Sequence, residues 1–270
     1  VTVDDESFSV WNNGERGIPI EIHKEHDMYV PEMIFGHCHT SSNYDDSESR
    51  DWAGTNGYGA KLAIIFSKRS EIVVTHNDKK YVQAFSKNLT VRSKPKITKS
   101  KAAHSVKIAI EPDFDRFHME NFKSNDTINM MYKRVLEIAA LSPETVKVWW
   151  NGARLKVNSF DGLVDAFVDK KDRVTAIDGE WSVAVAMSPV DRFEQVSFVN
   201  GVRTAEGGTH VDAVMNPLIK TITERFQAKH KDVTIKASYI KDNVMIFVNK
   251  RVVNPSYSSQ TKERLISTYK

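Results

Sequence analysis

The sequence contains one cysteine among 270 residues, so no disulfide can form within the chain. It has no apolar run close to the roughly 20 residues that a membrane-spanning helix needs, and we expect no membrane contact. It also lacks a surplus of one charge, because 38 basic residues stand against 35 acidic residues. These absences exclude a disulfide-stabilised secreted domain and a transmembrane protein. The formal net charge of +3 identifies no partner by itself.

Length and composition favour a folded chain. At 270 residues the chain is long enough for one large or two ordinary domains, and 40% hydrophobic residues can fill sizeable cores. It begins with Val1-Thr2-Val3, without an initiator methionine or a leader, so we expect part of a longer intracellular protein. We place the domain boundary after residue 145, which gives domains 1–145 and 146–270.

Hydrophobic periodicity predicts the helices. Apolar residues between 128 and 138 recur at helical spacing, which predicts a helix that Asp126 caps and that ends before Pro143. A second stripe, from Val211 to Phe226, predicts a longer helix in which Pro217 removes one hydrogen bond. Short apolar groups predict two more helices, at residues 32–37 and 62–66.

Short apolar or alternating runs between turn residues predict the strands. We expect hairpin turns at Asn77-Asp78 and Asn151-Gly152, and core positions for Trp149, Trp150 and Trp181. The predicted strands span residues 8–11, 71–75, 81–85, 106–110, 146–150, 155–157, 181–187, 195–199, 233–237 and 244–248. Helices and strands together indicate two successive α/β units.

A glycine-rich segment ahead of residues 62–66 is a candidate binding site. Gly54, Gly57 and Gly59 let the backbone turn tightly and approach a bound group closely. If a helix starts at Lys61, its free N–H groups and the lysine ammonium attract phosphate. The segment matches neither the P-loop nor the Rossmann pattern, which needs a strand immediately before it. A glycine-rich turn without a ligand is therefore the alternative.

Seven motifs occur in a fixed order along the chain: WNNGERGIPIEIH, YVPEMIFGH, TSSNYDD, GTNGYGAKL, SFVN, GGTHVD and NPSYSSQTKERL. Together, from Ser9 to about Leu265, they resemble the ATPase region of eukaryotic-type DNA topoisomerase II, of the type IIA family. Bacterial gyrase B is a poorer match. The resemblance implies an α/β fold (an α+β sandwich), with an ATP-binding domain of the gyrase, heat-shock chaperone, histidine kinase and MutL type. A smaller α/β transducer domain would follow it.

The resemblance also implies which residues bind ATP. The superfamily residue that opens the D-x-G-x-G motif contacts the adenine amino group, and Asn12 stands at that position. Because the motif here is one residue longer, Asn13 is the alternative. The residues matching the ribose and phosphate contacts are Ser41, Ser42 and Asn43, and those matching the triphosphate loop are Gly54, Thr55, Asn56, Gly57, Tyr58, Gly59, Ala60 and Lys61.

The loop departs from the family pattern at two positions, since Ala53 replaces a glycine and Thr55 replaces an arginine. Without the guanidinium, one phosphate contact is weakened or rerouted. The resemblance assigns a catalytic role to Gln260 and Lys262 in the transducer loop. There the Lys262 ammonium would contact the γ-phosphate, stabilise its developing charge and distinguish ATP from ADP. This contact would couple the phosphate state to domain orientation. Without the resemblance, Lys262 would be interpreted as a solvated surface charge.

ATP and Mg²⁺ are the cofactors that the resemblance implies. The family's catalytic Glu and Mg²⁺-binding Asn lie upstream of the first strand, so we assign no metal ligand in this chain and expect it to hydrolyse ATP poorly alone. The full-length protein would relax and decatenate DNA by strand passage, as a homodimer that binds DNA without sequence preference. We expect it in the nucleus or another DNA-containing compartment, with a viral origin open. The alternative is a non-hydrolysing nucleotide- or DNA-binding module with the same fold.

Two further signals carry open alternatives. Residues 79–110 contain no Asp or Glu, so they either contact DNA phosphates or form a solvated basic loop. The basic residues that cluster there are Lys87, Arg92, Lys94, Lys96, Lys99 and Lys101. His37-Cys38-His39, with His23 and His26 nearby, offers soft ligands for Zn²⁺. We favour a packed or partly exposed segment without metal.

Overall fold

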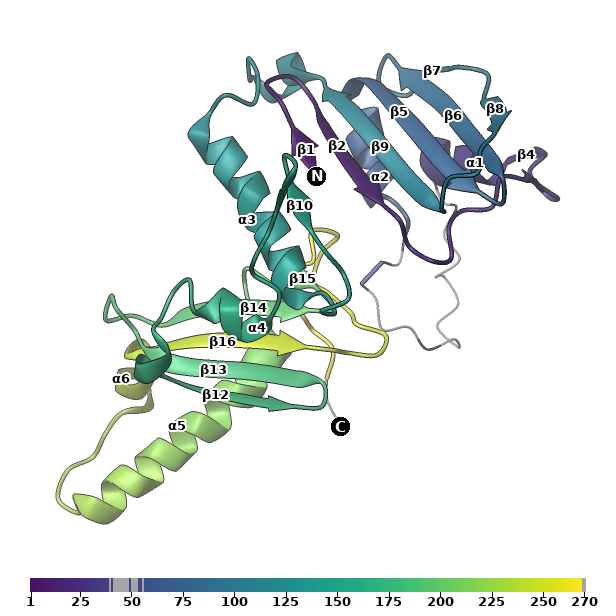
Figure 1. Cartoon of the computed structure of the whole chain (residues 1–270). Coiled ribbons are helices and arrows are strands. Elements are labelled where there is room, and N and C mark those ends of the chain that lie inside the picture. The colour runs from purple at the N-terminus through teal and green to yellow at the C-terminus, as the bar shows by residue number, and fades with distance from the viewer. Residues whose placement is uncertain (39, 41–48, 50–52, 55, 269–270) are drawn as a thin grey trace. The chain divides into compact units, whose positions relative to one another are not determined.

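The structure is a computed structural model that describes residues 1–38, 40, 49, 53–54 and 56–268. The chain divides into two compact units (Figure 1). Unit 1 comprises the described residues within Val1–Asp45, Gly54–Val135 and Lys147–Leu155, and unit 2 those within Asp46–Ala53, Leu136–Val146 and Lys156–Lys270. No helix among the described residues is long and apolar enough to cross a bilayer. The boundary between the expected ATP-binding and transducer domains, after residue 145, stays a prediction.

Unit 1 is built on a seven-stranded antiparallel sheet of order β1-β2-β9-β5-β6-β7, with β8 paired to β6. Its strands are β1 (Thr2–Val3), β2 (Phe8–Asn12), β5 (Ser67–His76), β6 (Lys79–Ser86), β7 (Val91–Arg92), β8 (Lys96–Lys99) and β9 (Ser105–Pro112). The four strands predicted here are confirmed. Asn77 and Asp78 join β5 to β6 with φ of 45° and 59°, the left-handed conformation that a tight hairpin turn favours.

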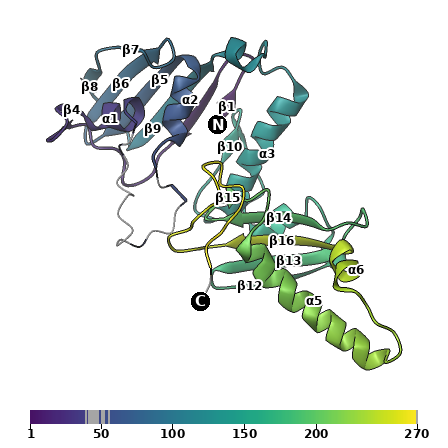
Figure 2. The ribbon, with the colours of Figure 1, turned by 180° about the vertical axis from the view of Figure 1, so that it is seen from behind.

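Two helices cover one face of this sheet, as Figure 2 shows from behind. They are α1 (Val30–Gly36), which carries Pro31 at its start, and α2 (Gly59–Ile65). Both predicted helices are confirmed, although α2 begins two residues before Lys61. Ile64 of α2 packs into a core with Ile72, Tyr81 and Phe85. A small hairpin, β3 (Ile22–His23) with β4 (Met28–Tyr29), precedes α1, and a 3-10 turn, η1 (Phe114–Phe117), follows β9.

Helix α3 (Asn125–Leu141) ends before Pro143 as predicted, but it begins one residue before Asp126. The prediction that Asp126 caps it is wrong; this carboxylate lies in the first turn, where the helix dipole favours negative charge. The helix contributes residues to both units.

The hairpin after α3 belongs to unit 1. It consists of β10 (Trp149–Trp150) and β11 (Ala153–Arg154), so its turn at Asn151-Gly152 is confirmed while its strands are shorter than predicted and residues 155–157 form none. The amide of Asn151 donates to the carbonyl of Val1 at 2.9 Å. Trp149 is 40% exposed, so the prediction that it is a core residue is wrong.

Unit 2 has a five-stranded sheet of order β12-β13-β16-β14-β15, in which only the β14–β16 pairing is parallel. Its strands are β12 (Arg173–Asp178), β13 (Trp181–Met187), β14 (Glu194–Val199), β15 (Val202–Arg203) and β16 (Val244–Lys250). The predicted strands at 181–187, 195–199 and 244–248 are confirmed. The one at 233–237 is wrong: Val233 is 52% exposed, and helix α6 (Ala237–Asp242) begins at the end of that segment.

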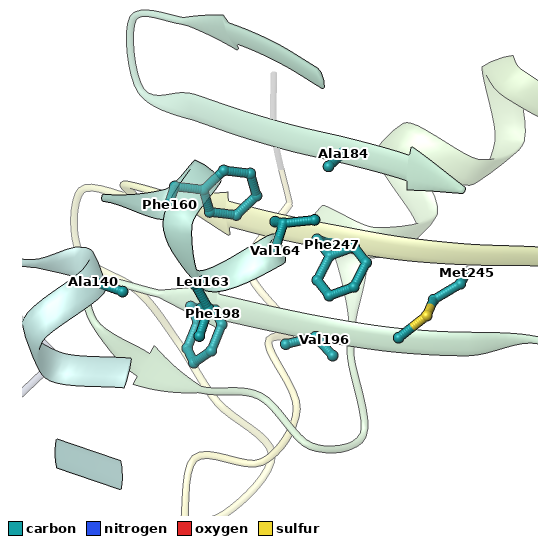
Figure 3. Packing of buried hydrophobic residues seen from close by; sticks show 9 residues of the cluster. All are labelled: Ala140, Phe160, Leu163, Val164, Ala184, Val196, Phe198, Met245 and Phe247. Atoms are coloured by element: carbon teal, nitrogen blue, oxygen red, sulfur yellow. The ribbon is translucent and has the colours of Figure 1, made fainter. Parts of the chain in front are cut away.

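Both faces of this sheet are covered. On one face, α4 (Phe160–Val164) packs Phe160 and Val164 against Phe198 and Phe247 (Figure 3). On the other, α5 (Thr209–Lys229), which contains Pro217 as predicted, packs against β16 through residues such as Met215. A strand buried on both faces is apolar at nearly every position, and β16 has that sequence. A 3-10 turn, η2 (Lys170–Asp172), precedes β12.

Candidate functional site

The predicted triphosphate loop leads directly into α2. Gly57 has a φ of 64°, a conformation that favours glycine. A Cβ at Gly59 would meet nothing within 4 Å, so space alone does not require that glycine. Of the residues assigned to nucleotide contacts, Ser41, Ser42, Asn43 and Thr55 lie outside the described residues.

Lys61 anchors this loop. Its side chain is 2% exposed, and its Nζ donates to the hydroxyl of Thr40 and to the carbonyl of Gly57, both at 2.8 Å. Burial lowers the pKa of Lys61, while nearby Cys38 acts in the opposite sense. Two oxygen acceptors therefore hold a buried ammonium at the glycine turn, and that ammonium fixes the position of the turn.

Thr40 connects the anchor to α1. Its Oγ1 lies 3.0 Å from the carbonyl oxygens of both Met33 and His37, so its single proton can be donated to one of them while a lone pair accepts from Lys61. Thr40 carries no signal in the sequence beyond its place as the first residue of the TSSNYDD motif. Its contribution depends on a contact between residues 21 positions apart.

Asn12 is the last residue of β2 and stands opposite Val106 of β9. Opposed residues of an antiparallel pair point to the same face, so Asn12 lies on the face that packs against the helices. Asn13 follows the strand. Farther along this loop, Gly17 has a φ of 60°, and a Cβ there would come within 2.5 Å of His76 Nδ1. The WNNGERG motif thus needs glycine at position 17 for a close approach.

Lys262 lies in a short loop of unit 2, the lysine loop, between Ser258 and Arg264. Its base closes where the Ser258 amide donates to the Arg264 carbonyl at 3.0 Å. Lys262 has a φ of 61°, uncommon for a residue with a side chain, and its amide donates to the Ser259 carbonyl at 3.1 Å. Its side chain is half-buried, and burial lowers its pKa. Among the described residues, no carboxylate pairs with its ammonium.

The lysine loop is mounted on the Gly207-Gly208 turn at the start of α5. The Leu265 amide donates to the Gly207 carbonyl at 3.1 Å, and the Thr209 amide donates to the Leu265 carbonyl at 3.2 Å. Thr209 Oγ1 also donates to the Ser267 carbonyl at 2.6 Å. Gly208 has a φ of 129°, and a Cβ there would lie 2.2 Å from the Leu265 oxygen. Only glycine permits this mount.

A buried polar network connects the start of α5, next to the Gly207-Gly208 turn, to the sheet of unit 2. His210 Nε2 lies 3.0 Å from Thr204 Oγ1, which lies 2.6 Å from Ser197 Oγ. Burial lowers the pKa of His210 to about 4, so its ring is neutral near pH 7. His210 Nδ1 has no partner among the described residues. The sequence places Gly208 and His210 in the GGTHVD motif, but nothing in it indicates that they support Lys262.

The described residues offer one cluster that could hold a metal ion, made of His23, Glu25 and His26, whose ligand atoms lie within 4.8 Å of one another. Two imidazoles do not suit Mg²⁺, which prefers oxygen ligands. This cluster is therefore not a candidate Mg²⁺ site. His37, which the sequence offered as a possible Zn²⁺ ligand, is not part of this cluster. Its Nε2 lies 2.7 Å from Arg92 Nη1.

Comparisons with known proteins agree on one family. The family model described as DNA gyrase B matches residues 153–270. DNA topoisomerase 2 of Pisum sativum is 41% identical over 281 residues, which cover 98% of this chain and 19% of the relative. The chain thus spans about a fifth of the length of the curated relatives it matches.

Two solved structures have the same fold. The ATPase region of Saccharomyces cerevisiae topoisomerase II has a TM-score of 0.91 at 37% identity, with 98% of this chain and 70% of that chain covered. The ATPase and transducer domains of DNA topoisomerase II from Balamuthia mandrillaris have a TM-score of 0.93 at 35% identity, with 98% and 69% covered. These matches confirm the predicted fold class.

Proposed function

Because the chain belongs to the type II DNA topoisomerases and matches their ATPase region, we propose that it binds and hydrolyses ATP to operate the entry gate for a DNA duplex. Its fold is that of the gyrase, heat-shock chaperone, histidine kinase and MutL group. The full-length protein would be a DNA topoisomerase that relaxes and decatenates DNA.

The nucleotide would lie against the helix-covered face of unit 1. Asn12 is better placed than Asn13 to contact adenine, since its register directs it to that face. The triphosphate would contact the backbone from Gly54 to Lys61, which Gly57 turns and Lys61 anchors. Ser41, Ser42 and Asn43 are proposed for the ribose and phosphates from the motif match. Mg²⁺ would neutralise phosphate charge when bound, through ligands outside the described residues.

Lys262 is the proposed γ-phosphate contact, and Gln260 the second catalytic residue. The observation that carries this role is a half-buried ammonium, without a carboxylate partner among the described residues, on a loop that a rigid backbone mount supports. A cation fixed in advance stabilises charge that develops on the transferring phosphoryl group. Because Lys262 belongs to unit 2 and Lys61 to unit 1, a nucleotide that binds both couples its phosphate state to the arrangement of the units.

The remaining parts of the proposal concern partners and location. The partners would be duplex DNA, bound without sequence preference, and a second copy of the full-length protein. The protein would work in the nucleus or another DNA-containing compartment. The family membership supports both statements.

The test is Lys262→Ala in the full-length protein, with Lys229→Ala, in the last turn of α5, as the matched control. We expect Lys262→Ala to lower ATP hydrolysis by at least about 100-fold, comparable to the loss of one transition-state donor, and to abolish strand passage, while the control keeps both. Unchanged hydrolysis and strand passage in Lys262→Ala would contradict the role. ATP binding without hydrolysis in the unmodified protein would instead favour a non-hydrolysing module.

A further inference from the structure

The sheet face of unit 1 opposite α1 and α2 carries several exposed basic side chains. Figure 1 looks onto this face, and no helix of unit 1 crosses it. On β6, Tyr81 and Phe85 are buried in the helix-covered core, so the intervening Val82 and the preceding Lys80 lie on the opposite, open face. Strand pairing then identifies the neighbours on the same face.

Register places five residues in one line across five strands. Lys96 of β8 stands opposite Val82 of β6, which stands opposite Val73 of β5. Val73 also stands opposite Lys107 of β9, which stands opposite Trp11 of β2. Four inter-strand spacings give this row a length of about 19 Å. Lys96, Lys107 and Trp11 are exposed, the indole by 54%.

The segment that supplies most of this face is rich in positive charge, although the register also places Glu71 of β5 and Glu111 of β9 on the face. Residues 79–110 contain nine Lys or Arg and no Asp or Glu, and all nine cations are exposed. Among the described residues, none of the nine forms a salt bridge with a carboxylate.

From this row we propose that the face, named here the basic face and made of Lys80, Lys96, Lys107 and Trp11, binds the phosphate backbone of a DNA duplex. Lys96 and Lys107 lie three inter-strand spacings apart, about 14 Å, which corresponds to about four phosphates of one strand at a rise of about 3.4 Å each along the helix axis. Lysines supply point charges without a planar fork, which suits backbone contact rather than base recognition. Trp11 lies beside the lysines and covers apolar sugar surface. The proposal extends the DNA partner proposed above by giving it a second place to bind.

Binding is measured with this 270-residue chain and a fluorescent duplex of about 20 base pairs, without nucleotide, over a range of KCl concentrations. The variant carries Lys80→Gln, Lys96→Gln and Lys107→Gln. Its matched control carries Lys68→Gln, Lys123→Gln and Lys170→Gln, three exposed lysines that pair with carboxylates. Both remove three charges, so a general loss of positive charge affects them equally. Thermal unfolding shows that each variant keeps its fold.

We expect the slope of log affinity against log salt to fall by about 2 to 3 in the variant, and its affinity to fall by about 10- to 100-fold. The control should stay close to the unmodified chain. Equal losses in variant and control, or no loss in the variant, would overturn the proposal. Tighter binding to single-stranded DNA or RNA of the same length would also overturn it, because stacking on Trp11 would then dominate. Since no nucleotide is present, either result leaves the ATP proposal to its own test.

Discussion

Two lysines, one in each unit, are held in different ways. Lys61 is fixed by its own ammonium, which donates to Thr40 and to Gly57. Lys262 is fixed through backbone, because Leu265 and Gly208 mount the loop that carries it. The first arrangement uses the charge to shape a binding loop. The second leaves the charge available to a ligand. Substituting Lys61 should therefore disturb the protein's own binding loop, whereas substituting Lys262 should disturb mainly the contact with the ligand.

Of the two lysine supports, the Gly207-Gly208 turn that holds the lysine loop should lose the most stability on substitution. Gly208→Ala places a Cβ 2.2 Å from the Leu265 oxygen, so we expect unit 2 to lose about 4 kcal/mol of stability and the full-length protein to lose ATP hydrolysis. Denaturant unfolding and hydrogen exchange at the Leu265 amide measure the change. Gly179→Ala, at a φ of 53° with no atom within 4 Å, is the control and should cost about 1 kcal/mol. Equal costs would mean that the mount is not rigid.

The network under the mount should make unit 2 sensitive to acid. The folded-state pKa of His210 is about 4 against an ordinary value of 6.5, so the unfolded chain binds more protons between these values. Stability is then fully present above about pH 6.5 and falls by about 3 kcal/mol as the pH drops to about 4. Unfolding free energies over this range, compared with His210→Gln, measure it. If the two proteins have parallel pH profiles, His210 is not the sensor.

Substitution of Lys61 should change the stability of unit 1 little and its ATP affinity strongly. Lys61→Met keeps an unbranched side chain one atom shorter and removes a buried charge, so we expect stability to change by less than about 1.5 kcal/mol. Without the ammonium, Gly57 is no longer held, and ATP affinity should fall by at least about 10-fold, which corresponds to about 1.4 kcal/mol. Calorimetric titration with ATP measures this. Lys68→Met, an exposed lysine paired with Asp115, is the control, and an equal loss there would contradict the anchor.

Lys262 should matter least for stability. Its ammonium has no carboxylate partner among the described residues, so Lys262→Gln should change the unfolding free energy of unit 2 by less than about 0.5 kcal/mol and still remove the preference for ATP over ADP. Thermal unfolding and paired ATP and ADP titrations measure the two effects. A large loss of stability would show that the lysine organises its own loop, as Lys61 does.

Local sequence signals predicted the strands of five or more residues, with the exception of β12. The alternation in 81–85 and the Asn77-Asp78 turn each specify a structure within a few residues, and both are confirmed. The same reasoning gave a strand at 233–237, because alternation shows which side chains are apolar but not whether a sheet edge is open to pair. Strand β12 is absent from the prediction although it pairs with Trp181 to Ala186 of β13.

Local sequence signals do not predict the contacts that hold Lys61 and the loop of Lys262. Lys61 was predicted as a point charge toward phosphate, whereas its contacts with Thr40 and Gly57 depend on how α1 and α2 meet. Gly208 and Leu265 are 57 positions apart, and no periodicity links them. The motif match brought Lys262 and Gly57 forward as residues of one site, and that assignment stays a prediction.

The most direct test of the central claim is an experimental structure of the protein bound to a non-hydrolysable ATP analogue with Mg²⁺. The account predicts the triphosphate against the backbone from Gly57 to Lys61, and the Lys262 Nζ at about 2.8 Å from a γ-phosphate oxygen, the length of a charge-assisted hydrogen bond. A triphosphate bound elsewhere, or a Lys262 ammonium that remains in solvent while the analogue occupies the glycine turn, would contradict it.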